Sequence, residues 1–134
     1  MNQIFEFKET KNKIKNASDL FGNIKKINLD YSRENVLLFC LDARNKLISK
    51  EVLFMGGLDC CTLDPKVIFR TALKKNAHGL IIAHNHPSGN LEPSKEDENI
   101  TGILKDFGKM IGLRVLDSII FNKKEFYSIP VGGD

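Results

Sequence analysis

This 134-residue sequence has little cysteine and no long hydrophobic run. Its three cysteines, of which Cys60 and Cys61 are adjacent, form neither a disulfide framework nor a CxxC pair, which favours a reducing compartment. No stretch reaches the roughly 18 apolar residues of a membrane span, and the first residues lack a basic segment followed by an apolar one. We therefore expect a cytoplasmic protein with no transmembrane helix, no secretory signal and no membrane partner.

Strong charge bias, internal repeats and low-complexity segments are also missing. The net charge of +3 and the pI near 8.7 fall below the strongly basic balance of a dedicated nucleic-acid domain. The hydrophobic fraction of 42% and the charged fraction of 28% are typical of globular domains and exclude a disordered or collagen-like chain. We predict one domain over residues 17–134, after a polar N-terminal extension (residues 1–16) whose order the composition leaves open.

Apolar runs alternate with helix signals along the chain. We expect strands over 36–41, 47–54, 80–83 and 113–121, with an edge strand over 125–129. The second strand should end at Gly56–Gly57, and the chain should fray at its glycine-rich end. Helices are predicted from Ser18 to about Ile24, after Asp64–Pro65 and after Ser94. This order predicts an α/β or α+β layered domain, a mixed sheet flanked by helices.

The last two predicted helices have apolar residues at helical spacing. In the helix after Asp64 we expect the inward residues to be Ile68, Phe69, Ala72 and Leu73. In the helix after Ser94 we expect one apolar face made of Ile100, Ile103, Leu104, Phe107 and Ile111. Gly108 and Gly112 should end that helix.

The loop before the last predicted helix carries the residues most suited to chemistry. His84 and His86 lie two residues apart at the end of a predicted strand, so both should point to one side, about 6.6 Å apart along it. Pro87 and Gly89 then turn the chain, which brings Asp97 back towards the histidines. Two imidazoles and one carboxylate leave a fourth tetrahedral position for water, the arrangement of catalytic zinc sites.

Each of these residues also has a structural explanation. A single histidine in a loop is more often a polar surface residue than a ligand. Ser94 and Asp97 fit the Ser-x-x-acid capping pattern, so Asp97 taken alone is better explained as a helix cap. The combination is much rarer than its parts, because a His-x-His-Pro turn must meet an acidic residue in the first turn of the next helix.

The whole arrangement resembles a known family. His84-x-His86-Pro87 followed by Ser94-x-x-Asp97 matches the JAMM motif of the MPN/JAB metalloproteases, and the fuller strings 84–89 and 92–94 resemble its RadC branch. Segments 41–45, 51–54, 80–83 and 116–117 are similar as well, so the resemblance covers roughly residues 17–127. It implies an MPN/JAB (cytidine deaminase-like) fold and a zinc-dependent hydrolase that cleaves a peptide or isopeptide bond in a polypeptide substrate.

The resemblance also implies roles for individual residues. The zinc ligands would be His84, His86 and Asp97. Ser94 matches the motif serine, which helps to hold the tetrahedral intermediate. The family uses an upstream glutamate as the general base, for which Glu34 is the best positional match and Glu51 the rival.

Three departures from the family pattern bear on function. Asn85 stands where the deubiquitinating members carry serine or threonine, and Ser118 stands where RadC-like chains commonly have histidine. Longer RadC proteins also carry a helix-hairpin-helix region, for which we expect no room here, so a nucleic-acid partner is weakly supported.

A non-catalytic zinc-binding module for protein or DNA, associated with DNA repair, is the alternative function. A nuclease is disfavoured, because phosphodiester cleavage suits oxygen-rich or two-metal sites better. The oligomeric state is not predicted.

Overall fold

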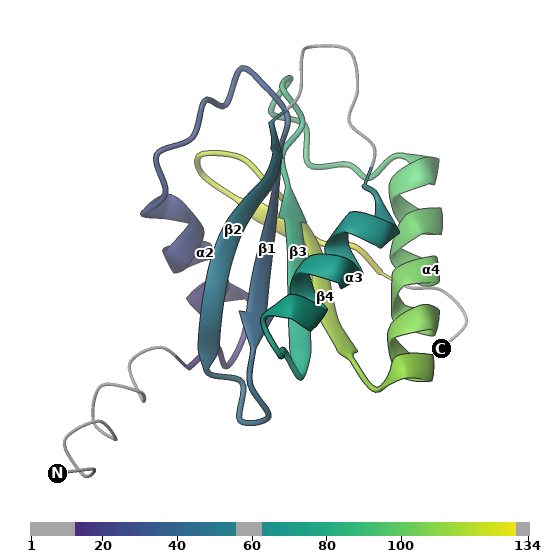
Figure 1. Ribbon diagram of the computed structural model, residues 1–134. Coiled ribbons are helices and arrows are strands. Elements are labelled where there is room, and N and C mark those ends of the chain that lie inside the picture. The colour runs from purple at the N-terminus through teal and green to yellow at the C-terminus, as the bar shows by residue number, and fades with distance from the viewer. Residues whose placement is uncertain (1–12, 56–62, 131–134) are drawn as a thin grey trace, which may run out of the picture.

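The structure is a computed structural model that describes residues 13–55 and 63–130. Its elements are α2 (Ala17–Lys25), β1 (Asn35–Leu41), β2 (Leu47–Met55), α3 (Pro65–Lys74), β3 (Gly79–His84), α4 (Lys95–Ile111), β4 (Arg114–Phe121) and β5 (Phe126–Ser128) (Figure 1). The predictions for residues 1–12, for Gly56–Gly57 and the adjacent cysteines, and for the glycine-rich end lie outside the described residues. Within the described ranges, no helix has the length and hydropathy needed to cross a membrane.

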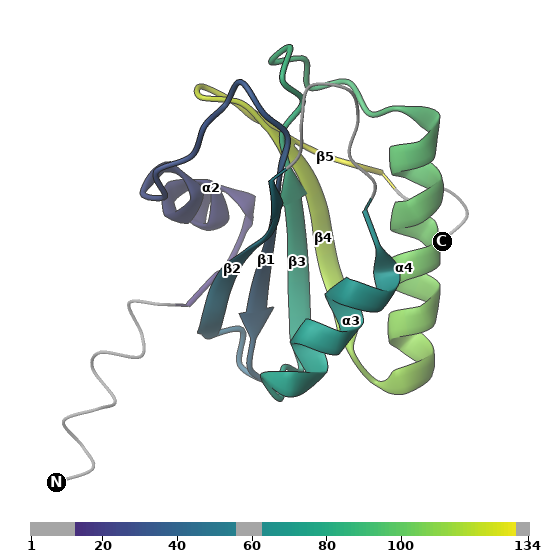
Figure 2. The same cartoon turned by 45° about the horizontal axis from the view of Figure 1, so that its top comes forward.

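A mixed five-stranded sheet forms the centre of the fold, in the order β2-β1-β3-β4-β5. β1 pairs antiparallel with β2 and β3, β3 and β4 are parallel, and β5 returns antiparallel to β4. Helix α4 is the crossover between the two parallel strands. α2 covers one face of the sheet, and α3 and α4 cover the other (Figure 1, Figure 2). The predicted mixed sheet flanked by helices is confirmed.

The position of strand β1 between two cores explains why its sequence is continuously apolar. Its side chains alternate between two cores: Val36, Leu38 and Cys40 pack towards α3 and α4, whereas Leu37 and Phe39 pack towards α2. A strand that is covered on both faces needs apolar residues at every position. β3 is buried along its whole length in the same way, so its last residue, His84, lies in the interior of the protein.

The helix starts are predicted well where the cap is followed by a clear apolar pattern. Asp64 caps α3 with Pro65 in the first turn, and Ser94 caps α4, as predicted. Helix α2 begins at Ala17, one residue before the predicted Ser18, and its cap is Asn16, whose Oδ1 accepts the hydrogen bond of the Asp19 amide at 2.9 Å. Ile14, from the predicted extension, is buried against the core on the α2 side.

The two glycines near the end of α4 have different roles. Gly112 ends the helix in the left-handed conformation with φ 74°, as predicted. Gly108 lies inside the helix and does not end it. A Cβ at Gly108 would collide with the carbonyl oxygen of Leu113, so glycine is required there for α4 to approach the start of β4.

The predicted inward faces of α3 and α4 are only partly correct. Ile68, Phe69, Ala72 and Leu104 are buried, and Ile100 is partly buried against the same core. The remaining predicted inward residues are exposed: Leu73 (56%), Ile103 (53%), Phe107 (43%) and Ile111 (40%). The apolar stripe of each helix is wider than its contact with the sheet, so one edge of each stripe is left uncovered.

Candidate metal centre

Two elements bring the candidate ligands together at the carboxyl end of β3. His84 is the last residue of β3, beside Val36 of β1 and Ile120 of β4, and its side chain is fully buried. His86 follows after one residue, and the turn that ends with Gly89 at φ 83° leads the chain towards α4. Asp97 then lies in the first turn of α4.

The three side chains converge on one point. Asp97 Oδ1 lies 3.4 Å from His84 Nε2, and Asp97 Oδ2 lies 3.1 Å from His86 Nε2. One ligand atom from each residue lies within 4.8 Å of the others. The sequence prediction that the turn returns Asp97 to the histidines therefore agrees with the geometry.

The hydrogen bonds of the two histidines fit a metal ion. Both ring nitrogens of His84 are buried without a hydrogen-bond partner in the described chain, and such orphaned groups are rare unless an ion or water completes them. The Nδ1 atom of His86 lies 2.9 Å from the carbonyl oxygen of Asn90. Because a carbonyl oxygen only accepts, Nδ1 carries the proton, and in the neutral ring the Nε2 lone pair then faces Asp97.

The charges in the cluster reinforce one another. Burial alone would raise the pKa of Asp97, but the neighbouring imidazoles of His84 and His86 outweigh it and hold this pKa far below its usual value. The hydrogen bond with Asp97 raises the pKa of His86 above its usual value, against the opposing effect of burial. The cluster thus keeps an ionised carboxylate and attracts positive charge, from protons or from a metal ion.

Asp97 serves the helix and the cluster at once. The Asp97 amide donates to Ser94 Oγ at 3.0 Å, and the Ser94 amide donates to Asp97 Oδ2 at 2.9 Å, which completes a capping box. The same Oδ2 faces His86. The two sequence interpretations of Asp97, helix cap and metal ligand, are therefore compatible, since the cap fixes the orientation of the carboxylate.

The two candidate bases lie in different surroundings. Glu34 is 6% exposed, directly precedes β1, and its charge is close enough to raise the pKa of His86. Because β1 and β3 are antiparallel with Val36 opposite His84, Glu34 lies at the metal-site end of the sheet. Glu51, on β2, forms an ion pair at 3.0 Å with Lys75, the residue that follows the C-terminal end of α3.

Asn85 has a role that sequence reasoning missed. Its Oδ1 accepts from the amide of Asn35 at 2.8 Å, and its Nδ2 donates to the carbonyl oxygen of Arg33 at 2.9 Å. One buried side chain thus holds the peptide groups on both sides of Glu34. The only signal in the sequence is that an asparagine lies between two histidines at the end of a buried strand. This signal indicates a buried polar network but does not show which groups the asparagine side chain contacts.

Ser118, the other departure from the family pattern, anchors α4. Thr101 Oγ1 donates to Ser118 Oγ at 3.2 Å, and both side chains are buried. Thr101 lies one turn after Asp97, so this bond ties the end of α4 that carries Asp97 to β4.

Comparisons with known proteins match this chain to one family over nearly its whole length. A family model described as a RadC-like JAB domain matches residues 14–133. A UPF0758 protein of Clostridium perfringens is 44% identical over 112 residues, which cover 81% of this chain and 49% of the relative. A UPF0758 protein of Thermotoga maritima is 39% identical over 102 residues, 76% of this chain and 46% of the relative. A third, from Methanococcoides burtonii, is 32% identical over 125 residues, 93% of this chain and 55% of the relative. The chain thus spans about half the length of these relatives.

Proposed function

The chain belongs to the family of RadC-like JAB domains, and we propose that it is a zinc-dependent hydrolase that cleaves a peptide or isopeptide bond. One observation carries the proposal. The ligand atoms of His84, His86 and Asp97 lie within 4.8 Å of one another, the two buried ring nitrogens of His84 make no hydrogen bond within the described residues, and the charge of the buried Glu34 acts on His86. A purely structural site would be closed by four protein ligands, whereas the described residues offer three.

The three ligands are those expected for zinc. Imidazole nitrogens and a carboxylate suit Zn²⁺, and the hydrogen bond of His86 to Asn90 orients its ring as outer partners of metal ligands commonly do. When bound, zinc would polarise the scissile carbonyl and lower the pKa of water.

Glu34 is the proposed general base. Its carboxylate takes a proton from the attacking water and passes it to the leaving nitrogen, a role worth about 10²–10⁴-fold in rate. Asn85 is a positioning residue, because it holds the backbone on both sides of Glu34. The ion pair of Glu51 with Lys75 leaves Glu51 less suited to this role.

Ser94 is proposed to stabilise the oxyanion that forms on the carbonyl oxygen. Its Oγ already accepts a hydrogen bond from the Asp97 amide, which fixes the oxygen, and its own proton has no acceptor among the residues that the structure describes, so it can be donated. A donor that is held in place before the reaction stabilises developing charge without reorganising.

The substrate is proposed to be a polypeptide. A cytoplasmic location, which the sparse cysteines favour, and a link to DNA repair stay predictions. The alternative function is a zinc-binding module that performs no hydrolysis. The buried carboxylate of Glu34 favours the hydrolase, because a binding module has no need to bury an acid beside its metal ligands.

The proposal is tested with the zinc-loaded protein, a pooled library of quenched fluorescent peptides and an isopeptide-linked set. We expect cleavage by the unmodified chain and loss of about 10²-fold or more in kcat/KM in Glu34→Gln, with unchanged zinc content. Glutamine keeps the shape of the side chain but accepts no proton.

Glu51→Gln is the matched control and should cleave at the normal rate. If Glu51→Gln abolishes cleavage and Glu34→Gln does not, the base is wrongly assigned. If the zinc-loaded chain cleaves neither set, the non-catalytic module becomes the better explanation.

A further inference from the structure

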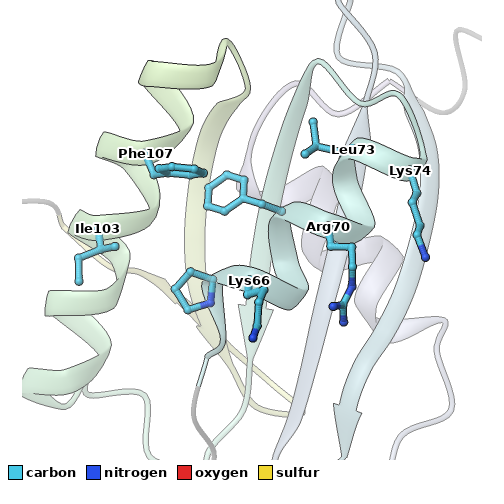
Figure 3. A pocket seen from close by; sticks show the side chains of 8 residues that line it. Lys66, Arg70, Leu73, Lys74, Ile103 and Phe107 are labelled. Carbon is cyan, nitrogen blue, oxygen red and sulfur yellow. The ribbon is translucent and has the colours of Figure 1, made fainter.

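An apolar groove runs between α3 and α4, away from the metal ligands. Its volume is about 740 Å³, and its apolar lining includes Phe69 and Leu73 of α3 and Ile103 and Phe107 of α4. Figure 3 shows Phe107 reaching from α4 towards α3. There it meets Phe69 in an edge-on ring contact with centroids 5.0 Å apart. Leu73, Ile103 and Phe107 are exposed residues that the sheet leaves uncovered, whereas Phe69 is buried and forms the floor of the groove.

All charged residues that line the groove are basic. Lys66, Arg70 and Lys74 follow one another at intervals of four residues along α3 and project from it beside the groove (Figure 3). All three are exposed, and none forms an ion pair with any residue that the structure describes, in contrast to the neighbouring Lys75. The row extends over about two helical turns, or about 12 Å.

We propose that this groove binds an acidic amphipathic helix of a partner protein. The apolar face of such a helix would cover Leu73, Ile103 and Phe107, as amphipathic helices fill apolar grooves elsewhere. Carboxylates spaced one turn apart along the partner would face Lys66, Arg70 and Lys74. The basic row requires a negatively charged partner helix, and the four-residue repeat of the row sets the spacing of the partner's carboxylates.

Other occupants fit the groove less well. A second copy would bring a basic row of its own towards the first, and like charges oppose such pairing. An anionic membrane would satisfy the charges, but a flat surface does not fill a hollow between two helices. The proposal does not depend on hydrolysis, because no candidate metal ligand lines the groove.

The test uses a labelled synthetic 16-residue peptide as the probe. It carries leucines at positions i, i+4, i+7 and i+11, with glutamates flanking them and alanine elsewhere. We expect saturable binding to the full chain by fluorescence anisotropy. A peptide with lysine in place of every glutamate, and one with serine in place of every leucine, should bind at least about tenfold more weakly.

Variants of the chain locate the binding. Phe107→Ser, and the triple variant Lys66→Glu, Arg70→Glu and Lys74→Glu, should each weaken binding of the acidic peptide at least about tenfold. The control triple Lys26→Glu, Lys50→Glu and Arg114→Glu makes the same change of net charge at exposed residues outside the groove and should bind normally. Circular dichroism and unchanged zinc content verify that each variant is folded.

Three results would overturn the proposal. The first is failure of the acidic peptide to bind, or binding that the groove variants leave unchanged. The second is sedimentation of the chain with phosphatidylserine vesicles that is lost in Phe107→Ser, which would assign the groove to a membrane. The third is a concentration-dependent dimer that Ile103→Asp abolishes, which would assign the groove to a second copy.

Discussion

The two ends of α4 differ in how completely their side chains are used. At the first turn, the carboxylate of Asp97 contacts His84 and His86 and also accepts the amide of Ser94. Towards the last turns, Met110 is 80% exposed and Phe107 has a contact along one edge of its ring. The same helix thus begins in a polar cluster whose carboxylate is engaged by several partners and ends in an uncovered apolar surface.

The difference follows from the range over which each kind of residue acts. Hydrogen bonds and ion pairs are directional and short, so a polar cluster must be completed by a few residues that are close in space. Apolar burial has no direction, so an apolar stripe on a helix specifies that something covers it but not which element does. An apolar surface left open by the fold is consequently the place where a partner is to be sought.

The largest expected difference between the two ends concerns zinc. His86→Ala removes a proposed ligand, and the zinc content should fall from the expected value of about one ion per chain to near zero. Phe107→Ser, at the other end, should keep its zinc. Elemental analysis after dialysis against buffer without chelator measures both.

His78→Ala serves as the control for the loss of a histidine, because His78 is exposed and does not belong to the cluster. Equal zinc in the unmodified chain and in His86→Ala would contradict the ligand assignment.

The next largest effect concerns two adjacent residues of α4. Leu104→Ala should lower the free energy of unfolding by about 2–5 kcal/mol, because its side chain is fully buried and leaves a cavity. Ile103→Ala should lower it by less than about 1 kcal/mol, since Ile103 is half exposed in the groove. Urea unfolding at fixed zinc concentration gives both values. Similar losses in the two variants would mean that the groove is closed in solution.

The sequence predicts the strands and most of the polar end of α4 correctly, because the signals there are local. The buried run of β3, the Asp64–Pro65 start and the Ser94 cap each depend on neighbours within four residues. The approach of Asp97 to the two histidines is harder to predict from the sequence. Their approach depends on the turn at Gly89 and on the packing of α4 against β4, and the family motif supplies that information where spacing alone does not.

What the sequence predicts poorly depends on long-range contacts. Helical periodicity includes Leu73 and Phe107 in an inward face, although both are exposed in the structure. The hydrogen bonds of Asn85 to residues 33 and 35 join positions about fifty residues apart in the chain, and no local pattern reveals them. Only the folded structure distinguishes the two candidate bases. The register of β1 against β3 places Glu34 at the end of the sheet where the histidines lie, whereas Glu51 forms an ion pair with Lys75.

A smaller effect tests this long-range contact. Asn85→Ala leaves the Asn35 amide and the Arg33 carbonyl without their partner, so the free energy of unfolding should fall by about 1–3 kcal/mol. Asn90→Ala is the matched control, because it keeps the backbone carbonyl that holds His86 and removes only an exposed hydrogen bond, from the Glu92 amide to Asn90 Oδ1 at 2.9 Å. It should cost less than about 0.5 kcal/mol. Chemical unfolding distinguishes the two, and an equal cost for both would show that the Asn85 contacts contribute nothing.

The smallest expected change in stability tests the double role of Asp97. Asp97→Asn keeps an oxygen that accepts the Ser94 amide, and Ser94→Ala removes the other half of the capping box. Each should lower the free energy of unfolding of the metal-free chain by about 1 kcal/mol. The two variants should differ sharply in zinc affinity. Asp97→Asn loses the proposed anionic ligand, so its zinc affinity should fall by about 100-fold or more. Loss of a residue that only hydrogen-bonds to a ligand lowers metal affinity by about 10–100-fold.

Ser94→Ala keeps all three ligands, so its zinc affinity should change by less than about tenfold. Competition with a chelating dye measures the affinities, and thermal unfolding without zinc measures the stabilities. If Asp97→Asn keeps its zinc and loses only stability, Asp97 is a helix cap alone. If Ser94→Ala loses zinc as severely as Asp97→Asn, the orientation that the cap gives the carboxylate matters as much as its charge, and the two roles of Asp97 are inseparable.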